Sequence, residues 1–255
     1  MQLNNAHAIV TGGASGLGHA VAAHIVRAGG KVSLMDVNAT LGMASATSLG
    51  ECAFFVATDV TDEAAVELAV KRAREFMGSI NVAVNCAGIG TAARLIGKLG
   101  PMPAAFFRQM IEINLVGTVL VSKAAAAAMQ TNEPNAGGER GVIIMTASVA
   151  AFDGQIGQVA YSASKGAIVA MTLPMARELA ASGIRVMSVA PGLFATPMLK
   201  ALPQEAQDSL GKQVPFPPRL GEPAEFAALV GHIIENIMLN GETIRLDGAI
   251  RMQPR

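Results

Sequence analysis

The chain has 255 residues, of which 51% are hydrophobic and 15% are charged, so it has ample material for a large core. Nineteen basic and nineteen acidic residues give a formal net charge of zero. This balance removes the electrostatic case for a dedicated nucleic-acid or anionic-membrane binder, and the apolar composition argues against disorder.

The cysteines and the N-terminal residues indicate the cellular compartment in which the protein works. Cys52, Cys86 and the four histidines have no zinc-site spacing, so we expect no metal, both thiols in the core and a reduced, cytoplasmic environment. No uninterrupted apolar run approaches the roughly 18 residues of a membrane span. The first residues lack the basic and apolar regions of a targeting peptide, so we expect no membrane association.

Strand-like and helix-like segments alternate along the chain. The predicted strands are Ala6–Thr11, Lys31–Asp36, Cys52–Ala57, Ile80–Asn85, Gly141–Ala147, Ile184–Ala190 and Glu242–Leu246. Helical periodicity lies near 16–29, 62–77, 103–130, 158–181 and 223–238. Continuously apolar strands are typical of a parallel sheet covered on both faces. The sequence therefore predicts one Rossmann-like α/β domain over residues 1–255, with a doubly wound sheet of seven parallel strands flanked by helices.

Three segments, 90–103, 132–139 and 193–219, have no clear periodicity, and the last contains five prolines. A long irregular segment inside a compact domain is typical of a functional lid, so we predict a substrate lid at about 193–219, with Met198 shaping an apolar pocket. Pro174 lies in a predicted helix, where we expect it to cause a kink.

The first predicted strand leads into the glycine-rich turn Thr11–Gly18 and then into a helix. Glycines let a backbone approach a ligand closely, and a helix N-terminus suits a pyrophosphate. The spacing G-x-x-x-G-x-G matches neither the common dinucleotide fingerprint nor a Walker loop. An ordinary strand-to-helix turn is the alternative, but the position at the first strand favours a dinucleotide.

An acidic residue, Asp36, ends the second predicted strand. A carboxylate there can bind both hydroxyls of an adenosine ribose and would repel a 2′-phosphate, so NAD is favoured over NADP. Asp59 follows the third strand, where it could meet the adenine amino group. A helix cap is an equally good interpretation of Asp59.

Tyr161 is the only tyrosine, and Lys165 lies one helical turn later. An ammonium ~4 Å away in an effective dielectric of ~20 contributes about 4 kcal/mol, so we expect Lys165 to lower the pKa of Tyr161 by roughly three units. A surface Tyr–Lys pair is the alternative. Ser148 follows a buried strand at the sheet edge where ligands bind, and Asn114 could hold a water that relays protons from Lys165.

These motifs together resemble the short-chain dehydrogenase/reductase family over essentially the whole chain. The resemblance is carried by Thr11–Gly18, Asn85–Gly88, Asn114, Ser148, Tyr161, Lys165 and Pro191-Gly192. It implies that Ser148 orients the substrate oxygen, Tyr161 is the acid/base, Lys165 holds the nicotinamide ribose and Asn114 supports a proton relay. Cys86 stands where the family usually has asparagine.

The match is closer to one branch, the type II 3-hydroxyacyl-CoA dehydrogenases, also described as 17β-hydroxysteroid dehydrogenase type 10. The resemblance to this branch implies a substrate contact at Gln155, an acyl-CoA substrate and a homotetramer. The cofactor contacts that the turn, the family and the branch imply together are at Gly12, Ser15, Gly16, Leu17, Gly18, Asp36, Asp59, Val60, Cys86, Gly88, Tyr161, Lys165, Phe194 and Thr196.

The expected reaction is NAD-dependent interconversion of a short or branched 3-hydroxyacyl-CoA and its 3-ketoacyl-CoA. The alternative within enzymes is an NAD-dependent hydroxysteroid or general secondary-alcohol dehydrogenase, and the lid decides between them. A cofactor-loaded scaffold is a third interpretation. The joint presence of Ser148, Tyr161 and Lys165 weighs against it, because a scaffold would not require all three.

Overall fold

The computed structural model describes residues 1–98 and 100–254, apart from the side chain of Met198, so the prediction for that side chain lies outside it. Seven parallel strands form one sheet in the order β3-β2-β1-β4-β7-β8-β9, which confirms the predicted fold class. The strands are β1 (His7–Thr11), β2 (Lys31–Asp36), β3 (Ala53–Ala57), β4 (Val82–Asn85), β7 (Gly141–Thr146), β8 (Ile184–Pro191) and β9 (Thr243–Leu246). Their carboxyl ends meet at one edge.

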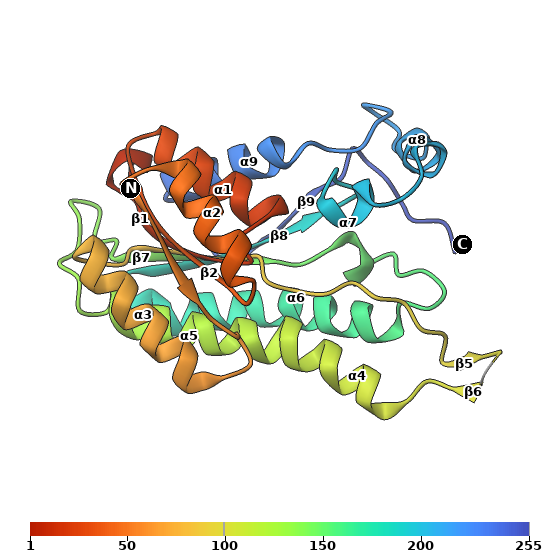
Figure 1. Cartoon of the computed structure of the whole chain (residues 1–255). Helices are drawn as coiled ribbons and strands as arrows, with labels where there is room; N and C mark the ends of the chain where they lie inside the picture. Colours follow the sequence, from red (N-terminus) through yellow and green to blue (C-terminus); the bar gives the residue numbers. More distant parts are fainter. Residues whose placement is uncertain (99, 255) are drawn as a thin grey trace.

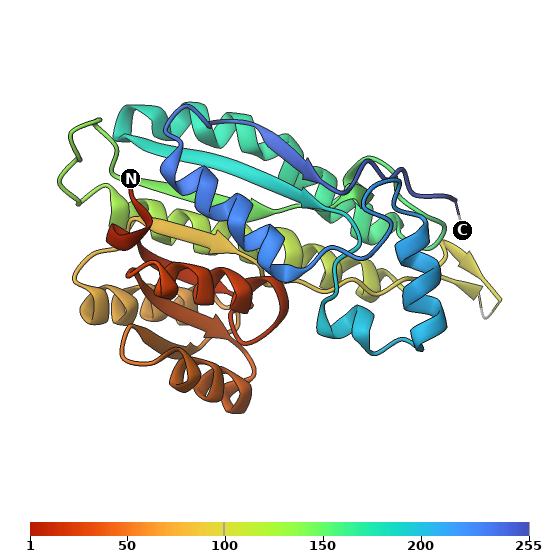
Figure 2. The same cartoon turned by 90° about the horizontal axis from the view of Figure 1, so that it is seen from above.

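Helices cover both faces of the sheet (Figure 1). One face carries α1 (Gly16–Arg27), α2 (Ala39–Leu49) and α9 (Pro223–Glu235), and Figure 2 views the sheet through them. The other carries α3 (Glu63–Met77), α4 (Ala104–Ile111), α5 (Gly117–Met129) and α6 (Val159–Leu179). Each layer of helices encloses its own apolar cluster against the sheet, because the strands present aliphatic side chains to both faces.

Several elements differ from the prediction. Helix α2 was missed, because its many small residues give it weak amphipathic character. Segment 193–219, which was predicted to be a lid without regular structure, contains two short helices, α7 (Pro197–Lys200) and α8 (Gln204–Lys212). Segment 90–103 contains a small hairpin of β5 (Ile96–Gly97) and β6 (Gly100–Pro101). Helix α6 contains Pro174 in its interior, as predicted, and the kink expected there stays a prediction.

The predicted helix 103–130 is interrupted at its centre. A π-helical turn, Glu112–Val116, joins α4 to α5 and contains Asn114. By length and a hydropathy of 1.4, Ala104–Met129 could cross a membrane, but 44% of the window that meets this criterion is buried inside the protein. Because α5 packs on α3, β4 and β7, we interpret this stretch as a core helix.

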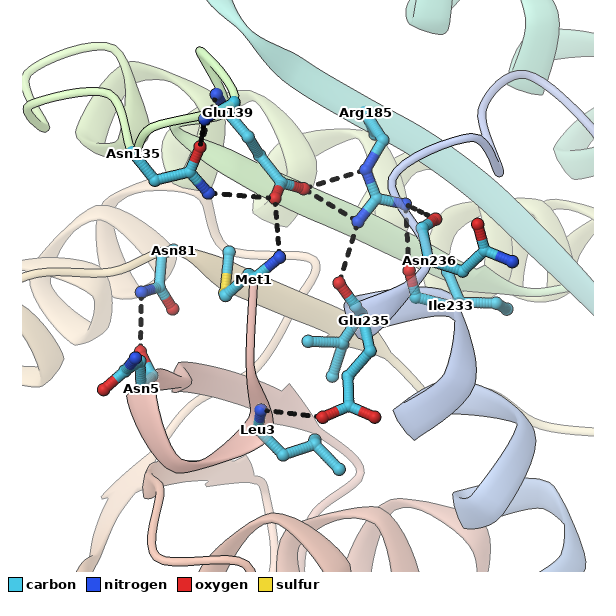
Figure 3. Close-up of polar contacts among 12 residues, drawn as sticks. Met1, Leu3, Asn5, Asn81, Asn135, Glu139, Arg185, Ile233, Glu235 and Asn236 are labelled. Atoms are coloured by element: carbon cyan, nitrogen blue, oxygen red, sulfur yellow. Dashed lines mark hydrogen bonds and ion pairs between the residues drawn. The ribbon is translucent and has the colours of Figure 1, made fainter.

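A buried ion pair fixes the edge of the sheet where the strands begin (Figure 3). Glu139, just before β7, accepts hydrogen bonds from Nε of Arg185 at 2.8 Å and from the Met1 amino group at 3.1 Å. Arg185, at the start of β8, also donates to the carbonyls of Ile233 and Ile234 near the end of α9. A cation at a helix C-terminus satisfies its free carbonyls, so this pair anchors α9 to the sheet at the edge opposite the ligand side.

Candidate active site

The glycine-rich turn after β1 approaches the end of β4 closely. A Cβ on Gly12 would lie 2.9 Å from the Ala87 nitrogen, and one on Gly18 would clash with the Gly12 oxygen. Gly12 also has a φ of 62°, in the left-handed region that favours glycine. The Thr11 hydroxyl accepts hydrogen bonds from the backbone N–H groups of Cys86 and Ala87, each at 3.1 Å. The turn and the β4 end therefore form one rigid platform.

A cavity of about 630 Å³ opens beside this platform at the N-terminus of α1, a volume typical of a ligand site. It is lined by most residues predicted to contact the cofactor: Gly12, Ser15, Gly16, Leu17, Gly18, Asp36, Asp59, Val60, Cys86, Gly88 and Thr196. Residues not predicted also line it, namely Met35, Val37, Thr58, Thr61, Ala87, Ile89, Gln109, Glu112, Ile113 and Pro197. The predicted dinucleotide residues therefore converge on one cavity.

Acidic side chains mark the end of this cavity at β2 and β3. The Asp36 carboxylate accepts hydrogen bonds from the backbone N–H groups of Ala14 at 3.2 Å and Asn38 at 3.0 Å, which orients it. Among the described residues that line the cavity there is no lysine or arginine to hold a 2′-phosphate. Asp59 accepts from the N–H and hydroxyl of Thr61, while Asp62 caps α3, so the helix-cap interpretation of Asp59 is wrong.

A second cavity of about 210 Å³ adjoins the first, and Ser148, Tyr161, Lys165 and Phe194 line it together. Ser148 follows β7 and caps a short 3₁₀ turn, its hydroxyl accepting from the Ala150 N–H at 3.1 Å. Tyr161 and Lys165 lie on the first turns of α6. The carboxyl edge of the sheet and one helix thus bring the three predicted catalytic residues to one small pocket.

Burial dominates the ionisation of this pocket. It raises the pKa of Tyr161, and a hydrogen bond with Ser148 opposes the shift. Burial also lowers the pKa of Lys165 to about 8, with Cys86 acting in the opposite direction. The Lys165 ammonium donates to the Thr146 carbonyl at 2.6 Å and lies 6.0 Å from the Tyr161 ring centre.

The prediction that Lys165 lowers the tyrosine pKa is therefore wrong for the protein chain by itself. That prediction counted the attraction of the ammonium and left out the cost of removing the phenolate from water.

Cys86 lies near Tyr161 and Lys165 and lines the same small pocket. It lines both cavities and packs, partly buried, against the apolar core, as predicted. Cys52 is also partly buried but belongs to neither core cluster, so the prediction of a core thiol is wrong for Cys52. Burial raises the pKa of the Cys86 thiol to about 11, against smaller opposing effects of Thr146 and Lys165. Cys86 is thus a neutral thiol beside the cofactor cavity at pH 7.

Asn114 lies behind the pocket and lines neither cavity. Its amide donates to the Ile89 carbonyl at 2.9 Å and to the Ser164 hydroxyl at 3.1 Å, and its oxygen accepts from the Ile89 N–H at 2.8 Å. A Cβ on Gly88 would lie 3.0 Å from this oxygen and 3.7 Å from the Lys165 nitrogen. Asn114 and Lys165 therefore flank Gly88, and the water relay between them stays a prediction.

Some functional positions differ from the sequence prediction. Gln155 does not line the pocket that holds Ser148, and its amide donates to the Gln253 carbonyl at 3.0 Å. Ser164 was missed because its contacts cross between helices, whereas Thr11 could have been found as a hydroxyl at a strand end. Within residues 1–98 and 100–254, no three His, Cys, Asp or Glu side chains gather in a manner that suits a metal.

Three comparisons agree with this geometry. The family model for short chain dehydrogenase matches residues 6–207. The 3-hydroxyacyl-CoA dehydrogenase type-2 of Bos taurus is 55% identical over 249 residues, 97% of this chain and 95% of that protein.

Two solved structures are similar as well. The crystal structure of 3-hydroxyacyl-CoA dehydrogenase type-2 from Mycobacterium avium has a TM-score of 0.95 and 40% identity, covering 99% of this chain and 98% of that one. The 7α-hydroxysteroid dehydrogenase complexed with NADH and 7-oxo glycochenodeoxycholic acid has a TM-score of 0.89 and 26% identity, covering 100% and 97%. This chain therefore belongs to the short-chain dehydrogenase family and is an oxidoreductase.

Proposed function

We propose that this enzyme interconverts a short or branched 3-hydroxyacyl-CoA and the corresponding 3-ketoacyl-CoA, with NAD as the redox partner. The observation that carries the proposal is the convergence of Ser148, Tyr161 and Lys165 on a pocket that adjoins the dinucleotide cavity. The names of the similar dehydrogenases from Bos taurus and Mycobacterium avium support the substrate class.

NAD, when bound, supplies an acceptor for the hydride that leaves the carbinol carbon. The Ser148 hydroxyl orients the substrate oxygen toward Tyr161. The Tyr161 phenolate takes the hydroxyl proton as the carbonyl forms, and the phenol returns it in the reverse reaction. Lys165, held on the Thr146 carbonyl, supplies positive charge beside the proton acceptor while it is protonated.

Asp36 and the cavity around it favour NAD over NADP. The carboxylate is oriented by two backbone N–H groups, and no lysine or arginine lies among the described lining residues. The close approach of the Gly12 turn to β4 leaves backbone N–H groups at the α1 N-terminus to face a pyrophosphate.

The catalytic pocket, of about 210 Å³, has room for the reacting part of a substrate, and the rest of an acyl-CoA or of a steroid would extend beyond it. A hydroxysteroid or general alcohol dehydrogenase is the second candidate, and the similarity to the 7α-hydroxysteroid enzyme supports it.

The test is a substrate panel with NAD, containing 3-hydroxybutyryl-CoA, its 2-methyl derivative, a hydroxysteroid and simple secondary alcohols. NADH formation fastest with a 3-hydroxyacyl-CoA supports the proposal. Turnover of the steroid or the free alcohols with no acyl-CoA activity contradicts it.

The remaining expectations concern assembly and place. We propose a homotetramer on the family resemblance alone, and a cytoplasmic location because the two cysteines are free and suit a reducing compartment. Light scattering on the eluting protein tests the first, and fractionation of the source cells tests the second. A monomer, or recovery with membranes, would overturn the corresponding proposal.

A further inference from the structure

One loop joins the two catalytic hydroxyl groups. Phe152–Gln158 runs from the 3₁₀ turn capped by Ser148 to the start of α6, which carries Tyr161. Its first end is fixed by the Asp153 N–H, which donates to the Val149 carbonyl at 2.8 Å. Its second end enters α6 through the Ser162 N–H, which donates to the Gln158 carbonyl at 2.7 Å. Movement of this loop would therefore change the distance and the relative orientation of the Ser148 and Tyr161 hydroxyl groups.

Arg245, on the edge strand β9, holds this loop from outside. Its guanidinium donates to Asp153 at 2.5 Å and to Asp247 at 2.7 Å, and lies 5.0 Å from the centre of the Phe152 ring. Arg245 and Asp153 have side chains only 21% exposed, so solvent weakens their interaction less than that of a surface pair. The pKa of Arg245 is raised overall. Burial is the largest single effect and lowers this pKa, but the interactions with the carboxylates of Asp153 and Asp247 together outweigh it.

The same guanidinium also anchors the C-terminal tail. It donates to the Ile250 carbonyl at 3.0 Å. Further along the tail, the Gln253 carbonyl accepts from the Gln155 amide and the Pro254 carbonyl accepts from the Ile156 N–H, both at 3.0 Å. Loop and tail therefore meet at Arg245 and again at Gln155.

We infer that Arg245 is a positioning residue of the active site, which acts through Asp153 on the loop between Ser148 and Tyr161. Because the loop is fixed at Asp153, it keeps Ser148 and Tyr161 at a constant distance and orientation. It also holds Gln155 beside the C-terminal tail. Arg245 lines neither the catalytic pocket nor the dinucleotide cavity, so it acts on the substrate site through its neighbours, of which Asp153 is the one that lies on the loop between Ser148 and Tyr161. This inference rests on the proposed function for its choice of substrate.

The kinetic test is a double-mutant cycle with 3-hydroxybutyryl-CoA and NAD. Arg245→Met and Asp153→Asn should each lower kcat/KM for the acyl-CoA by about tenfold, as a displaced positioning element does, while the KM for NAD stays within about twofold. The double variant should be no worse than either single variant. Arg245→Lys should restore part of the loss, because it keeps a cation beside Asp153.

The matched control is Arg251→Met. Arg251 lies on the same tail, and its side chain is 63% exposed. It donates to Asp247 at 3.4 Å and to the adjacent Ile250 carbonyl at 2.7 Å, and neither contact is with the loop, so the variant should behave as wild type. Two results would overturn the inference. If the losses of kcat/KM from the two single variants add in the double variant, Arg245 does not act through Asp153. If the KM for NAD changes as much as the KM for the acyl-CoA, the effect is not confined to the substrate site.

Hydrogen exchange gives a readout that does not depend on the substrate. In Arg245→Met, amides of 152–158 should exchange about tenfold faster than in wild type, with β1–β4 unchanged. If wild type fails to oxidise any 3-hydroxyacyl-CoA, the proposed function falls, and the kinetic cycle is run on the alcohol that is turned over. Unchanged exchange in 152–158 would overturn the positioning role whichever substrate is used.

Discussion

Replacing Asp36 by asparagine should relax the choice between NAD and NADP. The carboxylate is fixed by the Ala14 and Asn38 N–H groups and ends the cavity where the adenosine ribose is expected. Its hydrogen bonds to ribose hydroxyls are worth about 1.5–3 kcal/mol, as charged hydrogen bonds generally are. At ~5 Å and an effective dielectric of ~40, its repulsion of a doubly charged 2′-phosphate adds about 3 kcal/mol.

These two effects sum to about 4–6 kcal/mol, a preference for NAD of roughly a thousandfold to ten-thousandfold in wild type. An asparagine side chain at this position would remove the repulsion and keep a neutral donor and acceptor. We therefore expect Asp36→Asn to narrow the preference by about a hundredfold, and the change to shrink as salt rises.

The assay is titration of each protein with NADH and NADPH, followed by nicotinamide fluorescence at two salt concentrations. Asp59→Asn is the matched control, because Asp59 lines the same cavity and its carboxylate is already held by Thr61. It should change both affinities alike and leave their ratio unaltered. A wild-type ratio near one, or an Asp36→Asn ratio within twofold of wild type, would refute the reasoning.

Three further predictions follow from the buried groups. Arg185→Met leaves Glu139 buried beside one fewer cation and should cost about 3–5 kcal/mol of folding free energy, or roughly 6–20 °C in Tm, with kcat at 20 °C retained. Calorimetry at fixed protein concentration measures it, and a loss below about 1 kcal/mol would contradict the account of that ion pair. Because the pKa of Tyr161 is raised, the phenol is protonated at pH 7, so kcat/KM for oxidation should rise about tenfold per pH unit to about pH 8. Above that pH the slope should fall as Lys165 loses its proton, and a flat profile from pH 6 to 8 would contradict the assignment. Cys86, with a pKa of about 11, should react with iodoacetamide about a hundredfold faster at pH 10 than at pH 8, and NAD should protect it; mass spectrometry of the labelled peptide tests both.

Much of the architecture was predictable because the central strands β1, β4, β7 and β8 are buried on both faces. Their continuous apolar runs mark them clearly in the sequence, whereas the edge strand β9 is half-buried throughout and its sequence alternates. Helix α2 was not predictable in the same way, since its small residues pack on Phe55 without an apolar stripe; a Cβ on Gly42 would clash with that ring. Its contacts are decided by tertiary packing, which local periodicity does not report.

The candidate site likewise has residues that the local sequence identifies and residues that only tertiary contacts reveal. Residues that touch a ligand cavity directly, such as Gly12, Asp36, Ser148 and Tyr161, stand next to strand ends or helix starts, and their order along the chain identified them. Residues that hold others in place depend on contacts between distant segments. Arg245 meets Asp153 across 92 positions, and no spacing in the sequence announces it.

The ionisation of Tyr161 is a second case. The sequence shows the charges of the Tyr161–Lys165 pair but not their environment. Desolvation raises the pKa of the phenol, opposite to the expected direction, and lowers the pKa of Lys165 to about 8, so about half of this lysine is uncharged at pH 8. Pairwise electrostatics from spacing alone is therefore a poor guide where both partners are buried.

The proposed mechanism depends on the Tyr161 hydroxyl. The direct measurement is single-turnover NADH formation from 3-hydroxybutyryl-CoA by wild type and Tyr161→Phe, with NADH affinity determined on the same preparations. We predict unaltered binding and a rate about 10²–10⁴ lower in the variant, the usual worth of a general acid–base group. A variant that binds NADH and reduces NAD at the wild-type rate would contradict the mechanism.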